Sequence, residues 1–172
     1  VRLRGGFGAQ RLVGNRARNV LRGGPGADRL SGRGGNDTVI LGDDAFDTAR
    51  GGRGADRFVP TGSPQRFPRH PAAVPRRRTA HRISDFKPRA GDRLILRRSV
   101  FGPELKQLRR GFRVERARKP RPKRPRATLL FDTRRHLLSF DRDGTGPLAD
   151  KVIAVLPAAQ TVSRSHVILS RR

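Results

Sequence analysis

A nine-residue repeat constrains the fold of this chain more than any other feature. It begins at Gly5, and its units read GGFGAQRLV, GNRARNVLR, GGPGADRLS, GRGGNDTVI, GDDAFDTAR and GGRGADRFV, with Leu41 inserted before the fifth. The shared pattern is Gly-Gly-x-Gly-x-Asp-x-apolar-x. Repeats of this kind indicate a solenoid, because each short unit can bury its apolar residue only by stacking on its neighbours.

The spacing of glycine and apolar residues gives each unit a turn followed by a strand. Glycine at the first, second and fourth positions permits positive φ and brings backbone carbonyls close together. The last three residues can form a short strand whose apolar side chain faces inward. Those eighth-position residues are Leu12, Leu21, Leu30, Val39, Ala49 and Phe58. Two turns and two strands make one coil, so units two apart lie on the same edge.

The sixth position supplies the candidate metal ligands, and it holds Gln10, Asn19, Asp28, Asp37, Asp47 and Asp56. We expect Asp28 to stack with Asp47, and Asp37 with Asp56. Each pair of carboxylates, together with turn carbonyls, offers the roughly six hard oxygen ligands that Ca²⁺ prefers, whereas Mg²⁺ requires a tighter octahedron. Glycine and aspartate also populate ordinary turns. Their recurrence in register over several units favours the calcium interpretation.

The repeat resembles the RTX (repeats in toxin) family, the hemolysin-type calcium-binding repeats of bacterial secreted proteins. Residues 23–40 and 51–59 match best, and GGPGADRLS fits at every defined position. The resemblance implies a parallel β-roll with Ca²⁺ between successive turns. It also implies the ligands, which are the carboxylates of Asp28, Asp37, Asp47 and Asp56 with backbone carbonyls near Gly24, Gly26, Asn36, Gly52 and Gly54. Asn19, Asp43 and Asp44 are weaker metal candidates, since a neutral amide replaces the carboxylate at Asn19 and the two aspartates also fit an ordinary turn.

The composition changes after Phe58, and it divides the chain into repeats at 1–59, a Pro- and Arg-rich linker or loop at 60–80, and a C-terminal cap at 81–172. Apolar alternation predicts strands at 81–86 and 92–97, a hairpin at 128–131 and 137–140, and strands at 151–156 and 166–169. A short helix is predicted at 103–110, with Leu105 and Leu108 on one face. Residues 113–126 contain eight basic residues, one acid and three prolines, and predict a disordered loop. The expected fold is all-β: a parallel β-roll followed by a β-rich cap with one short helix.

Residues 81–169 look like the region that follows the repeats in many type I secreted proteins, including serralysin-like proteases. The matching segments are ISDF (83–86), GDRLI (91–95), LFD (130–132), DRDGTG (141–146) and VIAVL (152–156). The resemblance implies that this region caps the roll and carries an uncleaved export signal for type I secretion machinery. DRDGTG also begins like an EF-hand loop, but no acid stands at its fifth position and Val152 occupies the twelfth, so it predicts a turn. Because the chain does not begin with Met, we expect the tail of a larger secreted, extracellular protein.

The net charge of +26 comes from 40 Lys and Arg against 14 Asp and Glu. Such an excess commonly indicates a polyanion partner. The excess of basic residues does not extend to the repeats that match best, because residues 23–59 hold five Arg and six Asp. An alternative function is therefore a basic module that binds nucleic acid or an anionic surface through Arg76, Arg77, Arg78, Lys119, Arg121, Lys123 and Arg124. A solvated basic face explains the same residues equally well.

The sequence carries no signature of an enzyme. It contains no cysteine, which excludes disulfides, thiolate zinc sites and cysteine nucleophiles. It also contains no His-Glu-x-x-His, Gly-x-Ser-x-Gly or phosphate-binding Gly-x-x-x-x-Gly-Lys motif. The longest apolar run, at 152–156, is far shorter than the roughly 20 residues of a membrane span. We expect a monomeric, non-catalytic chain that binds calcium ions.

Overall fold

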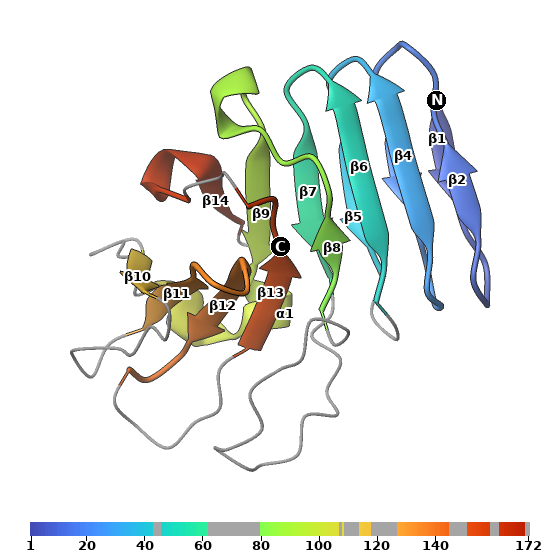
Figure 1. The fold of residues 1–172 in the computed structure, drawn as a ribbon. Coiled ribbons are helices and arrows are strands. Elements are labelled where there is room, and N and C mark those ends of the chain that lie inside the picture. The colour runs from blue at the N-terminus through green and yellow to red at the C-terminus, as the bar shows by residue number, and fades with distance from the viewer. Residues whose placement is uncertain are drawn as a thin grey trace.

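The computed structural model describes residues 1–42, 46–61, 80–106, 108, 114–117, 127–144, 151–158 and 162–170. Short strands recur along the repeats at the ends of the units, where the sequence predicts them; one more precedes the first unit, and two continue into the unit that follows. They alternate between two sheets, so that two consecutive units form one coil of a roll (Figure 1). These strands are β1 (Arg2–Arg4), β2 (Arg11–Val13), β3 (Val20–Arg22), β4 (Arg29–Gly34), β5 (Thr38–Leu41), β6 (Thr48–Arg53) and β7 (Arg57–Pro60).

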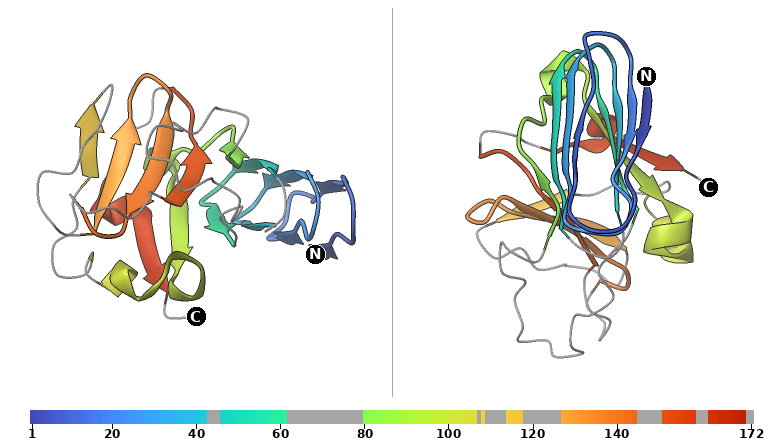
Figure 2. Two further views of the ribbon diagram at one scale, coloured as in Figure 1. Left: turned by 90° about the horizontal axis from the view of Figure 1, so that it is seen from below. Right: turned by 90° about the vertical axis from the view of Figure 1, so that its right-hand side faces the viewer.

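Neighbouring strands of the roll are parallel, and the eighth-position residues stay in register. Leu21 pairs with Val39 in one sheet, and Leu30 with Ala49 in the other. Their side chains are buried between the two sheets. The right-hand view of Figure 2, which looks along the flattened coils, shows the two sheets facing each other. The inserted Leu41 lengthens β5 and is itself buried. The parallel β-roll predicted from the repeat is therefore present.

The C-terminal part continues both sheets of the roll. Strands β9 (Arg93–Arg97) and β14 (Val167–Ser170) extend one sheet to the order β1-β3-β5-β7-β9-β14. The C-terminal strands of the other sheet are β8 (Arg82–Ile83), β10 (Val114–Ala117), β11 (Thr128–Asp132), β12 (Leu137–Asp141) and β13 (Lys151–Val155). This sheet has the order β10-β11-β12-β13-β8-β6-β4-β2, and it includes the predicted antiparallel hairpin of β11 and β12.

The helices are short. One of them, α1 (Arg98–Phe101), ends at Gly102, whose φ is 94°, before the helix predicted at 103–110. Helical structure begins at Pro103 as predicted, but as a 3₁₀ turn over Pro103–Lys106 in which Leu105 is buried; Leu108 is helical and buried as well. No described helix is long and apolar enough to cross a membrane. The 3₁₀ turns are η2 (Pro88–Ala90), η3 (Pro103–Lys106) and η4 (Arg164–His166).

The prediction of a disordered loop at 113–126 is wrong for its first part. Residues Val114–Ala117 form β10, which pairs in parallel with β11. Composition averaged over fourteen residues hides these four, whose backbone can pair with the edge of a neighbouring strand. Residues 113 and 118–126 lie outside the described residues, as do residues 62–79 of the predicted linker.

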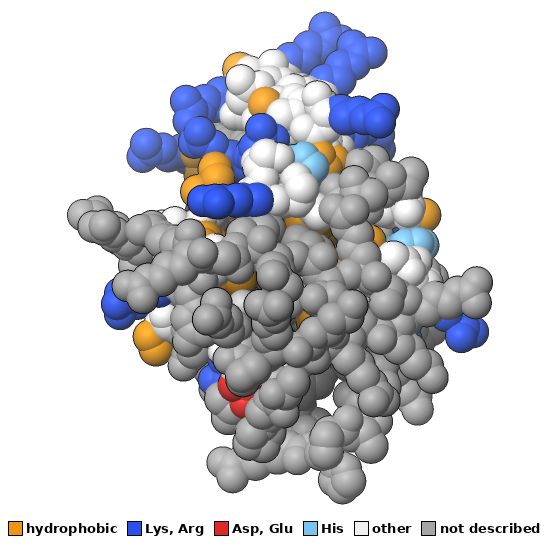
Figure 3. Space-filling view, turned by 90° about the vertical axis from the view of Figure 1, so that its left-hand side faces the viewer, with side chains coloured by type: hydrophobic (Ala, Val, Ile, Leu, Met, Phe, Trp, Pro, Cys, Tyr) orange, Lys and Arg blue, Asp and Glu red, His pale blue; other side chains and the backbone are white. Residues whose placement is uncertain are grey.

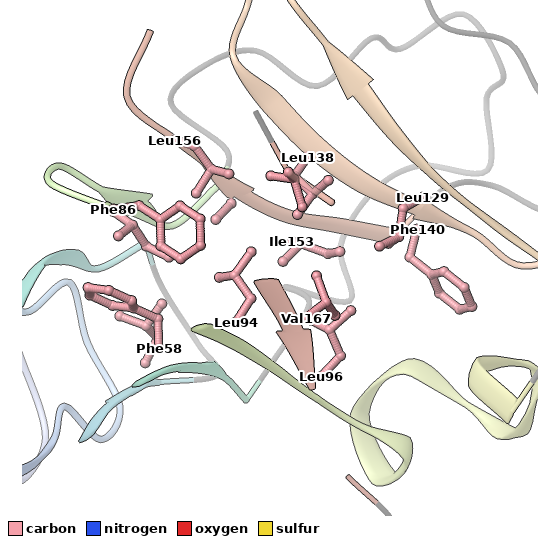
Figure 4. Packing of buried hydrophobic residues seen from close by; sticks show 14 of the residues in the cluster. Phe58, Phe86, Leu94, Leu96, Leu129, Leu138, Phe140, Ile153, Leu156 and Val167 are labelled. Carbon is pink, nitrogen blue, oxygen red and sulfur yellow. The ribbon is translucent and has the colours of Figure 1, made fainter. Parts of the chain in front are cut away.

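One hydrophobic core joins the roll to the C-terminal part. It runs from Leu21 inside the roll to Val167 in β14. At the junction, the rings of Phe58 and Phe86 meet edge to face with centroids 6.1 Å apart (Figure 4). The C-terminal part therefore closes one end of the roll, while the N-terminus lies at the other end (Figure 1).

Candidate metal centre

The sixth-position side chains form two ladders, one along each edge of the roll. In the first ladder, the Asp28 N–H donates to Asp47 Oδ1 at 2.8 Å. In the second, the Asp37 N–H donates to Asp56 Oδ1 at 2.8 Å. The same bond occurs one step earlier in each ladder, where the Gln10 N–H donates to Asp28 Oδ1 and the Asn19 N–H donates to Asp37 Oδ1. The expected stacking of aspartates two units apart is therefore present, with Gln10, Asp28 and Asp47 in the first ladder and Asn19, Asp37 and Asp56 in the second.

The ladder carboxylates are buried, each in a residue that is 1% exposed. Oδ2 of Asp28, Asp37 and Asp56 has no hydrogen-bond partner among the described residues. None of these three carboxylates forms a salt bridge with a described Lys or Arg, in spite of the basic composition. A buried carboxylate oxygen without a donor is costly unless a cation or a proton compensates it. The ladders thus place negative charge where a cation is needed.

Glycine at the first position of a unit makes room for these oxygens. A Cβ added to Gly32 would lie 2.6 Å from the Gly51 carbonyl oxygen and would collide with Asp37 Oδ2. A Cβ added to Gly23 would lie 2.7 Å from Asp28 Oδ2. A carboxylate oxygen and a carbonyl oxygen of the next turn therefore converge beside Gly32, in the space that a side chain would fill.

Backbone carbonyls are needed to complete a metal site. Within the described residues, no three Asp, Glu or His side chains form a group that could hold an ion. Carbonyl oxygens approach the later glycines, with Arg33 contributing its carbonyl at Gly52 and Gly35 contributing its own at Gly54. These two glycines have φ of 110° and 122°, which glycine adopts without strain. A set of carboxylate and carbonyl oxygens fits Ca²⁺.

Carboxylates crowd the last turn of the roll. The pKa of Asp56 is raised to about 6, first by burial and then by the carboxylates of Asp92, Asp37 and Asp85, against the lowering effect of the hydrogen bond from Asp37. Burial is also the main cause that raises the pKa of Asp92. Because repulsion between like charges favours protonation, a cation bound near this turn would relieve the repulsion and restore the ionised form.

Two residues of the C-terminal part extend the ladders, and sequence reasoning missed both. Asp92 Oδ1 accepts the Asp56 N–H at 2.9 Å, and His81 Nδ1 accepts the Asp47 N–H at 3.2 Å. A signal for Asp92 existed in the sequence, since Asp92-Arg93-Leu94 repeats the Asp28-Arg29-Leu30 of the third unit. It lacks the preceding glycine pattern, which explains why it was missed.

Asp85, also missed, fastens the C-terminal part to the last glycine turn. Its two carboxylate oxygens accept the N–H groups of Gly51 and Gly52, both at 2.9 Å. Its carboxylate also lies 3.5 Å from the Arg50 guanidinium. Asp85 therefore acts through hydrogen bonds that close the roll, with its oxygens already occupied.

The other candidate residues divide into those that the structure describes and those that it does not. Asn19 is fully buried, and Asn36 uses its side-chain oxygen to accept the Ala55 N–H at 2.9 Å. Asp141 Oδ1 accepts the N–H groups of Asp143 and Gly144, which makes the predicted turn. Outside the described residues lie Asp43, Asp44, Arg76, Arg77, Arg78, Lys119, Arg121, Lys123 and Arg124.

Comparison with known proteins supports the repeat and the fold. Residues 4–39 and 41–59 match the family model of the RTX calcium-binding nonapeptide repeat (4 copies). No curated protein matches the chain. Among solved structures, the chain is similar to the solution structure of the AlgE6R3 subunit from the Azotobacter vinelandii mannuronan C5-epimerase, with a TM-score of 0.54, 22% identity, and coverage of 95% of this chain and 80% of that chain. The repeats at residues 4–39 and 41–59 thus match the calcium-binding RTX repeat, and the fold is that of a β-roll.

Proposed function

We propose that this chain is the non-catalytic, calcium-binding C-terminal part of a secreted bacterial protein, and that Ca²⁺ between its turns stabilises the roll. The ligands are the carboxylates of Asp28, Asp37, Asp47 and Asp56 together with turn carbonyls. Asp47 differs from the other three, because its Oδ2 accepts the Gly42 N–H. One observation carries this assignment: Asp37 Oδ2 is buried without a hydrogen-bond donor among the described residues, next to the Gly51 carbonyl oxygen. A cation between these two oxygens would compensate the burial of both.

Calcium binding is coupled to folding in this proposal. Without the ion, the stacked carboxylates of each ladder repel one another and lack compensation for their burial. Binding to the folded state then adds its free energy to stability. The chain would be less stable inside a calcium-poor cell and would reach its full stability outside it. Secretion fits the RTX repeats, which are typical of secreted proteins.

In the same proposal, the chain has three parts, with repeats at 1–59, a linker or loop at 60–80 and a cap at 81–172. The cap closes the roll through the shared core and the bonds of Asp85, and it carries the signal for type I secretion machinery. The chain works as a monomer. A truncation that ends at residue 59 would lose export and would fold poorly even in calcium.

A second candidate function, polyanion binding, is favoured by the outer faces of the roll. The parallel register places Arg11 beside Arg29 on one face and Arg4 beside Arg22 on the other, and all four are exposed. Basic side chains also dominate the charged groups in the view of Figure 3. Such rows attract phosphate or sulfate groups, and binding to heparin or DNA that disappears at modest salt would reduce this to nonspecific attraction.

A calcium titration tests the proposed function. We expect the β signal in circular dichroism to rise as Ca²⁺ is added, and calorimetry to show bound ions. Asp37→Asn should weaken calcium binding about tenfold or more, because it removes a charged ligand. Asp132→Asn is the matched control, since Asp132 lies in β11, outside the ladders, and should bind calcium like the unchanged protein. No gain of β signal at millimolar Ca²⁺ would refute the proposal.

A further inference from the structure

The Asn19 side chain stands in the second ladder where later units have aspartate, and it is 0% exposed. Its amide nitrogen, Nδ2, is surrounded by oxygens from two successive turns. The four acceptors are the carbonyls of Asn15 at 3.2 Å, Ala17 at 2.5 Å and Gly32 at 3.3 Å, and Asp37 Oδ1 at 2.9 Å.

The three backbone carbonyls come from two repeat units. Asn15 and Ala17 are the second and fourth positions of the second unit, and Gly32 is the first position of the fourth unit. One coil further along the ladder, the same three positions are occupied by Arg33, Gly35 and Gly51. Their carbonyls likewise crowd the glycines of the facing turns. The ladder has two intervals, from Asn19 to Asp37 and from Asp37 to Asp56, and both present equivalent oxygens. In the first interval, the Asn19 amide donates among them. In the second interval, Asp37 Oδ2 is left without a partner among the described residues.

The orientation of the Asn19 amide follows from its surroundings. An amide group has two N–H donors on nitrogen and only acceptor capacity on oxygen. Turning the amide over would direct its oxygen at four other oxygens, which is unfavourable. In the orientation present, Oδ1 faces the Asn15 N–H at 3.4 Å, and the positive end of the amide dipole faces the four acceptors.

We infer that the Asn19 amide takes the place of a calcium ion in the first interval of the second ladder, so that this turn closes without metal. The inference rests on calcium binding in the rest of the roll, as proposed above. The first ladder gives independent support, because Gln10 Nε2 donates to the Phe7 carbonyl at 2.5 Å and Gln10 Oε1 accepts the Gly6 N–H at 2.9 Å. Both turns of the first coil are thus closed by neutral amides. That coil is a calcium-independent template on which later coils assemble as ions bind.

Asn19→Asp tests the inference by the number of ions bound. A carboxylate cannot donate, so the four acceptors lose their donor and gain a fifth oxygen, which creates the ligand set of the next interval. We expect Asn19→Asp to bind one more calcium ion per chain than the unchanged protein, measured by calorimetry and by metal analysis after dialysis. The matched control is Asn15→Asp, which adds the same charge in the same turn on an exposed side chain and should add no ion. Equal ion numbers for Asn19→Asp and the unchanged protein would overturn the inference.

Hydrogen exchange on the unchanged protein gives a second test that does not depend on a variant folding. The Asn19 N–H and the Asp37 N–H make the same bond one coil apart. In calcium-free solution, we expect the Asn19 N–H to exchange about tenfold or more slowly than the Asp37 N–H. Added calcium should slow exchange at Asp37 and leave Asn19 unchanged. An equal response at both positions would overturn the inference, whereas failure to bind any calcium would reject the proposed function itself and this inference with it.

Discussion

Replacing Gly32 by alanine probes the oxygen-lined space between two turns of the roll. The added Cβ would lie 2.6 Å from the Gly51 carbonyl oxygen and would collide with Asp37 Oδ2. The Asp37 side chain can rotate away, but the Gly51 carbonyl belongs to the backbone of β6 and must move with that strand. Alanine therefore displaces both of the oxygens that we assign to calcium.

The magnitude follows from two opposing effects. Overpacking a buried position costs about 1–3 kcal/mol. The smaller conformational entropy of an unfolded chain with alanine returns about 0.4–1 kcal/mol. We expect Gly32→Ala to lower the free energy of unfolding by about 1–2 kcal/mol without calcium. In excess calcium the loss should grow by about 1.4 kcal/mol for each tenfold loss of affinity.

Urea unfolding followed by circular dichroism, with and without calcium, measures both quantities. Gly6→Ala is the matched control, because no atom lies within 4 Å of its added Cβ and its φ is not positive. That variant should match the unchanged protein or be more stable by up to about 1 kcal/mol. If Gly32→Ala unfolded at the same urea concentration as Gly6→Ala both with and without calcium, the two oxygens would not converge in the space beside Gly32.

Three further predictions concern the roll end and the core. Because the pKa of Asp56 is raised from 3.8 to about 6, the folded state binds its proton more tightly, so calcium-free stability should rise by about 1 kcal/mol as pH falls from 7 to 5. Asp56→Asn should lack this gain in urea unfolding, and an equal gain in both proteins would contradict the assignment. Asp85→Ala removes both acceptors of the last glycine turn and should cost about 2–4 kcal/mol, so unchanged thermal unfolding would show that the cap does not need them. Phe58→Ala should lower the free energy of unfolding by about 3–5 kcal/mol in calorimetry. Phe7→Ala, at a residue that is 90% exposed, should lower it by less than about 0.5 kcal/mol. Similar losses in the two variants would contradict the assignment of Phe58 to the core.

The roll could be predicted from sequence because a single period encodes several levels of its structure. Glycine fixes where the turns lie, and one apolar residue per unit fixes which side faces inward. The sixth position then stacks as a consequence, as it does for Asp37 and Asp56. The inserted Leu41 did not break this register, because β5 lengthens to include it.

The junction with the cap could not be predicted in the same way. Asp85 and Asp92 lie beyond the last unit, and the ladder step from Asp56 to Asp92 spans 36 residues instead of 18 or 19. The nine-residue period does not extend over this distance, so only the folded structure shows that Asp85 and Asp92 contact the roll. The role of Asn19 was hidden for another reason. Its sequence position shows a neutral amide, while the direction of that amide depends on oxygens contributed by two turns.

A diffraction map of the calcium-loaded protein tests the central claim most directly. We predict a calcium peak between the turns that contain Asp37 and Asp56, in contact with Asp37 Oδ2 and the Gly51 carbonyl oxygen. No peak should replace the Asn19 amide among its four acceptors. A map from crystals in excess calcium that shows no ion beside Asp37 would contradict the account.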